Sequence, residues 1–278
     1  MIWQNIYSLI PVLVLAVLPS LVWLFFYLKE DLHPEPRYWL FVIFIMGVAL
    51  APLVIFLEMV LNKWGNGALI FLIAPLVEET AKYGVVHLTL NKNPVLDEPV
   101  DGMIYVIVAA LGFAAIENVF AIFSFIPVGS SGYLSATFNF MSMRFISAVA
   151  LHGLASGIAG YYFAKFYFTP LEAARPQGPS GALAPLEPLP LTGQARARLL
   201  TGFIEKKPIL IFKGLFLATI LHGIYNFLII KNEETFPLIL TGIILGAAAV
   251  LVIYLFNRLK HYKTYQQVIV DEAVENKI

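Results

Sequence analysis

The segment 75–82 places three ionisable side chains inside an apolar run of the sequence. Glu78, Glu79 and Lys82 lie near the middle of the stretch 68–90. A charge at the centre of a bilayer costs about 2.5–3.5 kcal/mol on insertion scales, so these groups must face protein or water and satisfy one another. Their i,i+3 and i,i+4 spacings let the Lys82 ammonium reach either carboxylate. The segment therefore predicts a functional site inside a membrane helix.

Three other apolar runs carry polar side chains at a similar depth. Counted from the expected cytoplasmic end of each run at 1.5 Å per residue, Glu78 lies about 18 Å deep and Glu117 about 20 Å. On the same count, His222 lies about 20 Å deep and His152 about 24 Å. The runs alternate in direction, so sequence order does not impose this agreement. We expect one polar layer, at the bilayer midplane or slightly to its outer side, around a cavity.

Several catalytic mechanisms are excluded for this polar layer, because the chain lacks the residues or motifs that they need. It has no cysteine, which excludes thiol catalysis and cysteine-ligated metals. No histidine is followed by glutamate, so the HExxH zinc motif is absent, and every aspartate falls in a predicted loop or the tail, which excludes an aspartyl pair. Ser156 does not lie in a GxSxG nucleophile elbow.

What remains is a set of carboxylates, two imidazoles and amides. A glutamate can take a proton from water with help from an imidazole. His222 and Asn226, spaced i,i+4 on one helix face, can then donate to the oxyanion of a tetrahedral intermediate. The candidate catalytic residues are Glu78, Glu79, Glu117, His152, His222 and Asn226, with Lys82 and Asn118 in support. A metal such as zinc is the alternative, and its candidate ligands are Glu78, Glu117, His152 and His222.

Each of these residues also has a purely structural interpretation. A single histidine or asparagine in a membrane helix more often makes a helix–helix hydrogen bond, and a Glu–Lys group can be a buried ion pair. Six such residues at one depth favour a functional site over packing alone. Outside the layer the structural interpretation is preferred: we expect Asp101 to cap a helix N-terminus and Arg144 to reach the outer membrane interface.

Composition predicts an all-α, polytopic membrane helical bundle. Of the 278 residues, 59% are hydrophobic and 13% charged, and the mean hydropathy is +0.80. A soluble domain has about 25% charged residues. With no net charge and no basic face, a nucleic-acid partner is not expected. About seven runs are long enough to span a bilayer, near 6–28, 38–61, 68–90, 103–127, 141–168, 209–230 and 236–256.

Lysine and arginine positions predict the orientation of the bundle. Twelve of them lie in the loops after the first, third and fifth runs or in the tail, whereas the opposite side has only Lys63 and Lys231. This bias predicts a cell-membrane protein with an extracytoplasmic N-terminus and a cytoplasmic C-terminus. We expect a single membrane-embedded domain over 1–278, with a catalytic core at about 68–230. A flexible Pro-rich loop at 169–208 and a charged tail at 258–278 are expected in the cytoplasm.

The polar motifs resemble those of the PrsW family of intramembrane proteases. The matching segments are Glu78-Glu79-Thr80-Ala81-Lys82 (EExxK), Phe113-Ala114-Ala115-Ile116-Glu117-Asn118 (FxxxEN), His152, and His222-Gly223-Ile224-Tyr225-Asn226 (HxxxN), with Asp101-Gly102 before the second of them. The resemblance covers about 75–227. It implies a peptidase that cleaves a membrane protein or peptide, in PrsW itself an anti-sigma factor, at the extracytoplasmic side. The wider clan includes the CAAX prenyl endopeptidases and bacteriocin-processing proteins. The resemblance to this clan implies that Glu78 activates water and that His222 with Asn226 binds the oxyanion.

The chain departs from the clan at one position, and two other function classes stay open. CAAX-type members have a histidine where this chain has Glu117, so His152 is the candidate for the missing imidazole. One alternative is a non-catalytic polytopic scaffold, because the clan resembles the polytopic non-catalytic subunit of gamma-secretase. The other is a proton-coupled transporter, since relays use intramembrane carboxylates and histidines; the lack of a visible inverted repeat counts against it.

Overall fold

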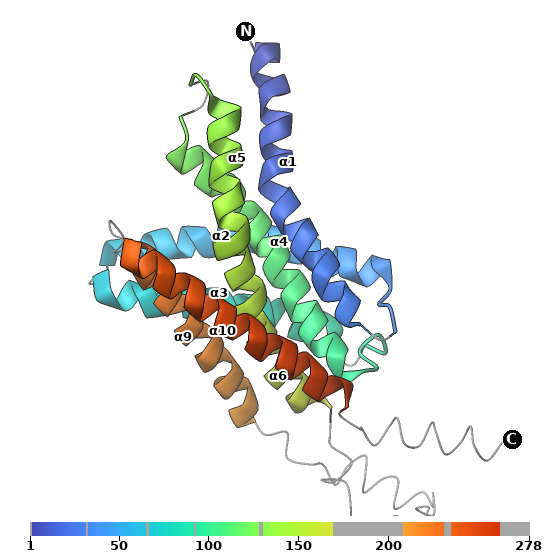
Figure 1. Cartoon of the computed structure of the whole chain (residues 1–278). Helices are drawn as coiled ribbons and strands as arrows, with labels where there is room; N and C mark the ends of the chain where they lie inside the picture. Colours follow the sequence, from blue (N-terminus) through green and yellow to red (C-terminus); the bar gives the residue numbers. More distant parts are fainter. Residues whose placement is uncertain are drawn as a thin grey trace, which may run out of the picture.

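The structure is a computed structural model that describes residues 2–31, 33–64, 67–91, 93–127, 130–168, 208–230 and 235–261. Over these residues every regular element is helical, so the all-α prediction is confirmed. The helices are α1 (Ile2–Tyr27), α2 (Arg37–Trp64), α3 (Gly67–Leu90), α4 (Pro99–Phe125), α5 (Tyr133–Arg144), α6 (Ala150–Tyr167), α9 (Pro208–Ile230) and α10 (Thr235–Lys260), as Figure 1 shows. A 3-10 turn, Leu28–Glu30, follows α1, and a π-helical segment, Phe145–Val149, joins α5 to α6.

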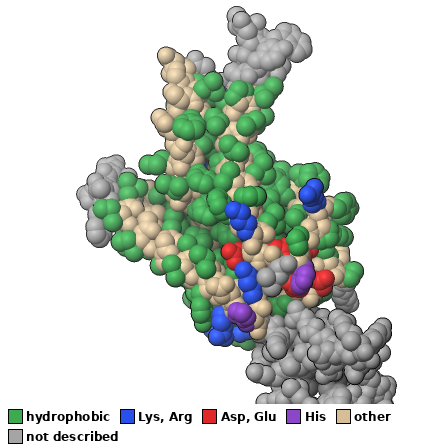
Figure 2. Space-filling model, turned by 45° about the vertical axis from the view of Figure 1, so that its right-hand side comes forward, with side chains coloured by type: hydrophobic (Ala, Val, Ile, Leu, Met, Phe, Trp, Pro, Cys, Tyr) green, Lys and Arg blue, Asp and Glu red, His purple; other side chains and the backbone are tan. Residues whose placement is uncertain are grey.

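Six segments of the described chain are long and apolar enough to cross a membrane. They are α1, α2, α4, the continuous run from α5 to α6, α9 and α10. The remaining expected span, α3, is not among them, and it is the helix that carries Glu78, Glu79 and Lys82. Large apolar side chains cover most of the visible surface, whereas charged ones gather in its lower half (Figure 2). The chain is a multi-pass membrane protein.

The start of α4 differs from the sequence prediction. Asp101 is not the N-cap: Glu98 is, and Asp101 lies three residues further along in a capping box. Its Oδ2 accepts the backbone N–H groups of Glu98 at 2.7 Å and of Asp97 at 3.0 Å. Pro99 explains the shift, because a proline without an N–H is favoured at the first helical position. The fourth helix therefore begins at Pro99, four residues before the predicted 103.

Helix α4 forms the centre of the bundle and packs against α1, α2 and α6. Its side chains are buried from Pro99 to Ala115. Small residues let α6 approach it closely: a Cβ at Gly160 would lie 2.8 Å from the Met103 Cα, and one at Gly102 would lie 2.9 Å from the Ala164 Cβ. Close backbone approach through small residues is typical of helix pairs in membranes. It fixes the helix that carries His152 against the helix that carries Glu117.

Helix α9 packs against α3 in the same manner. A Cβ at Gly223 would collide with the backbone carbonyl oxygen of Phe71, and the Phe71 and Phe227 rings meet edge to face with centroids 5.6 Å apart. This contact sets His222 beside the carboxylates of α3. Two predicted segments, the Pro-rich loop up to residue 207 and the tail after residue 261, lie outside the described residues.

Candidate active site

Lys82 joins the two carboxylates of α3 to a histidine of α6. Its side chain is fully buried, and Glu78 and Glu79 are 3% and 1% exposed. The Lys82 Nζ lies 2.9 Å from each of Glu78 Oε2, Glu79 Oε1 and His152 Nδ1. An ammonium has three N–H donors, so these contacts use all of them. The Phe113 ring of α4 covers the same ammonium, with its centroid 4.6 Å from Nζ.

The contacts of His152 determine which of its nitrogens carries the proton. An ammonium can only donate, so Nδ1 accepts from Lys82. In the neutral ring the proton is then on Nε2, which lies 2.7 Å from Glu117 Oε2 and donates to it. His152 therefore links the cation of α3 to the carboxylate of α4 through its two ring nitrogens.

Side chains from α3, α9 and α6 bind the Glu79 carboxylate, and each of its two oxygens accepts at least one hydrogen bond. Its Oε1 lies 3.0 Å from His222 Nδ1 as well as contacting Lys82, and its Oε2 accepts from the Ser156 hydroxyl at 2.7 Å. A carboxylate can only accept, so His222 donates from Nδ1 and presents the lone pair of Nε2.

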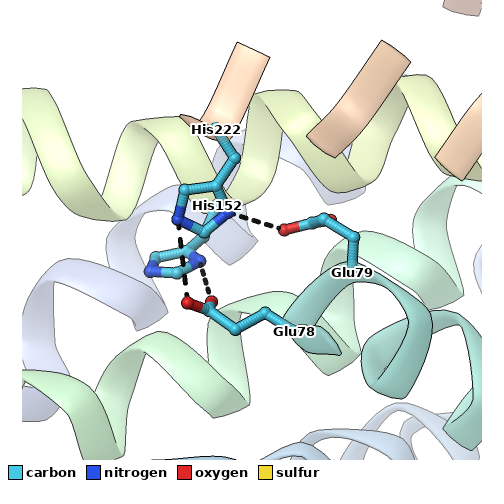
Figure 3. A group of neighbouring side chains, drawn as sticks. All are labelled: Glu78, Glu79, His152 and His222. Carbon is cyan, nitrogen blue, oxygen red and sulfur yellow. Dashed lines mark hydrogen bonds and ion pairs between the residues drawn. The ribbon is translucent and has the colours of Figure 1, made fainter. Parts of the chain in front are cut away.

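Glu78 keeps one oxygen directed toward the second histidine. Its Oε1 lies 3.9 Å from His222 Nε2, and the two imidazole rings stand perpendicular with centroids 5.1 Å apart (Figure 3). This distance is too long for a direct hydrogen bond and short enough for one water molecule to contact both atoms.

Arg144, which the sequence predicted to extend to the membrane interface, has its guanidinium bound by two site residues. Its Nε donates to Asn118 Oδ1 at 2.6 Å, and its Nη2 lies 3.5 Å from Glu117 Oε2. The Asn118 amide in turn donates to the Ala16 carbonyl of α1 at 2.9 Å. Arg144 and His152 flank the π-helical segment, and such wide turns are frequent at functional sites.

A cavity of about 300 Å³ opens beside these groups. Its polar lining residues are Glu78, Glu117, Ser124, Arg144, His152, His222, Tyr225 and Asn226. Asn226 thus lies in the same cavity as His222, as its i,i+4 spacing predicted. The residues that the sequence placed in one layer are brought together from α3, α4, α6 and α9.

Glu58 of α2 is a neighbour that the sequence prediction missed. Its carboxylate is close enough to interact electrostatically with Glu78 and Glu117, and its Oε1 is buried without a hydrogen-bond partner. One signal was present in the sequence, because Glu58 is an acidic residue inside the apolar run 38–61.

Comparison with known proteins agrees with this arrangement. The model of the PrsW family of intramembrane metalloproteases matches residues 35–185, more than half of the chain. The chain belongs to the PrsW family. No solved structure matches it.

Three curated PrsW-family relatives illustrate the likeness. Protease PrsW of Geobacillus kaustophilus is 27% identical over 76% of this chain and 75% of the relative. Protease PrsW of Oceanobacillus iheyensis is 26% identical over 84% and 89%, and Protease PrsW of Clostridioides difficile is 33% identical over 55% and 65%. The predicted family resemblance is confirmed, and the chain is an intramembrane protease that acts on a protein substrate.

The family description implies a metal, and the site has suitable donors. Glu78, Glu79, His152 and His222 each offer one ligand atom, and these atoms lie within 4.8 Å of one another. Imidazole nitrogens and carboxylate oxygens are zinc ligands, with bonds of about 2.0–2.2 Å, so the donor types and spacing fit. This group contains Glu79 where the sequence suggested Glu117, whose Oε2 is bound by His152 and lies near Arg144.

Proposed function

We propose that this PrsW-family protease hydrolyses a peptide bond of a membrane protein or peptide with water activated by Glu78 and assisted by the histidines. The supporting observation is the facing pair of Glu78 Oε1 and His222 Nε2, 3.9 Å apart. Glu78 lines the cavity, whereas both oxygens of Glu79 are already bound. Glu78 is therefore the better placed of the two adjacent carboxylates to act on a water molecule.

The other groups have roles that follow from their contacts. Lys82 lies between the paired carboxylates and donates to one oxygen of each, which leaves Glu78 Oε1 directed toward the cavity. Glu78 takes the proton from the attacking water and returns it to the departing amine, so that the protons balance. Asn226 and His222 face the cavity where the oxyanion forms. The Asn226 amide can donate to the oxyanion, whereas His222 donates there only once its Nε2 is protonated, because its Nδ1–H is bound to Glu79. Glu79 holds the His222 ring in one orientation through Nδ1.

The metal alternative uses the same side chains. Glu78, Glu79, His152 and His222 would hold a zinc ion, which supplies a water of lowered pKa and polarises the scissile carbonyl. Lys82 contacts three of these four residues, so its ammonium competes with a metal for their lone pairs. By the family resemblance, a membrane-anchored anti-sigma factor is the expected substrate class.

The test compares purified variants on a single-span reporter substrate in detergent. We expect Glu78→Gln to lower the cleavage rate by about 10²–10⁴-fold, the usual contribution of a general base. His222→Ala should also inactivate. Thr219→Val is the matched control: Thr219 is buried on α9 one turn before His222, has no hydrogen-bond partner and does not line the cavity.

Each outcome decides between the function classes. If Glu78→Gln cleaves as fast as wild type, Glu78 is not the general base and the proposed mechanism is wrong. If wild type cleaves nothing across a broad panel of substrates, the proposal of peptide hydrolysis at this site is wrong, and the scaffold and transporter alternatives are favoured. Activity that is lost with a chelator and restored by zinc assigns water activation to a metal.

A further inference from the structure

A second group of carboxylates lies far from the cavity, at the start of α4. Glu35 in the loop before α2, Asp97 in the loop before α4, and Asp101 in the first turn of α4 each offer one oxygen, all within 4.8 Å of one another. Glu117 lies sixteen positions after Asp101 on α4, which is about 24 Å along the helix at 1.5 Å per residue. The group is therefore distinct from the candidate active site.

One buried oxygen of this group has no hydrogen-bond donor. Asp101 is 1% exposed, and its Oδ1 is buried without a hydrogen-bond donor from the rest of the described chain. The Asp101 carboxyl group faces that of Glu35, while its Oδ2 accepts the two backbone N–H groups that cap α4. Glu35 is 7% exposed, and its Oε2 accepts the Tyr105 hydroxyl at 2.5 Å. A buried acceptor without a donor is destabilising, so a ligand that satisfies Asp101 is favoured.

The charge of the group is also unbalanced. Over the part of the chain that the structure describes, no lysine or arginine forms an ion pair with Glu35, Asp97 or Asp101. The nearby Asp31 adds another carboxylate, which accepts the backbone N–H groups of His33 and Glu35. Negative charge is thus costly here, and a cation would relieve it.

We propose that Glu35, Asp97 and Asp101 bind a divalent cation that prefers oxygen ligands, Ca²⁺ or Mg²⁺. The donors are all carboxylate oxygens, the set that these hard cations select. A cavity of about 590 Å³, lined by Glu35, Asp97 and Trp39 among others, gives access from the surface. The cation would fasten the loop after α1 to the first turn of the central helix.

Terbium luminescence tests this site without any protease assay. Tb³⁺ is an oxygen-seeking substitute for Ca²⁺, and Trp39 in the cavity wall and Tyr105 on Glu35 can sensitise its emission. We expect saturable emission from the full chain in detergent, reversed by whichever of Ca²⁺ or Mg²⁺ is the natural occupant. Asp97→Asn should bind terbium at least about tenfold more weakly, the smallest loss typical when a metal site is disturbed.

Asp97 is exposed, so its replacement by the isosteric amide should leave the fold intact. Glu30→Gln is the matched control, because that carboxylate is bound by Lys260 at 2.7 Å and lies outside the group. Wild type, but not Asp97→Asn, should also gain thermal stability with Ca²⁺ or Mg²⁺. Equal terbium affinity in Asp97→Asn and wild type would overturn the proposal. Terbium emission that is lost in Glu78→Gln instead of Asp97→Asn would also overturn the proposal. The absence of emission from wild type would overturn it as well.

Discussion

Lys82 supplies the positive charge beside the buried carboxylates of Glu78 and Glu79. It is a single ammonium between two carboxylates, and it is fully buried. Its presence at i+4 and i+3 from the glutamates was readable from the sequence, and so was the pairing. Its contact with His152 was not, because that contact joins residues 70 apart and depends on how α6 packs.

We expect Lys82→Met to lower the free energy of unfolding by about 3–5 kcal/mol, because it leaves buried carboxylates without their cation. Denaturant unfolding of the purified protein in mixed micelles, followed by circular dichroism, measures this. The matched control is Lys213→Met on α9, an exposed ammonium over the Tyr162 ring, which should change stability little. Similar losses in both variants would show that Lys82 does not neutralise the site.

Arg144 makes side-chain contacts that could not be predicted from the sequence. An arginine near the end of an apolar run usually extends to the interface, and the sequence favoured that outcome. The guanidinium also binds Asn118 and Glu117 on α4, and these contacts depend on how the helices pack. Glu58 was missed for a related reason, because the face that α2 turns toward Glu78 is set by packing and not by spacing along α2.

At the scale of the helices, the sequence predicted the elements well and their junctions poorly. Helices α3, α4, α6 and α9 were expected to carry the site, and they do bring its residues together. The Glu98 cap and the π-helical segment were not foreseen. Apolar run length locates a span, but it does not show where the first backbone N–H is capped or where a turn widens.

Glycine contacts hold the site helices in register, and Gly223 offers the clearest test. A methyl group there would collide with the Phe71 carbonyl and lie 3.2 Å from a Leu72 side-chain carbon, so Gly223→Ala should push α9 away from α3. Overpacking of this kind costs about 1–3 kcal/mol. We expect a lower melting temperature together with slower cleavage, since His222 moves away from Glu79.

Gly246→Ala on α10 is the control for that experiment. Nothing lies within 4 Å of a Cβ at Gly246, and alanine favours a helix over glycine by about 1 kcal/mol, so this variant should be neutral or more stable. Should Gly223→Ala keep full stability and activity, the α3–α9 contact would not position the histidine.

At the scale of the whole molecule, the multi-pass architecture is established and its orientation is our prediction. The chain has no cysteine, so single introduced cysteines report their side of the membrane without background. Ser131, before α5, and Asn91, after α3, are both exposed. A membrane-impermeant maleimide should label Ser131→Cys in intact cells and Asn91→Cys only after permeabilisation. The reverse pattern would place the N-terminus in the cytoplasm.

The contact between Glu79 and His222 joins residues that are 143 positions apart. A ribosome that adds about 5–20 residues per second needs roughly 7–29 s to travel from one to the other. During that interval the nascent chain already holds both carboxylates and the ammonium in the membrane but lacks the second imidazole. Under the proposed mechanism, proteolytic competence therefore arises only when α9 has been synthesised and inserted, and until then the growing enzyme spares the other chains that enter the membrane beside it.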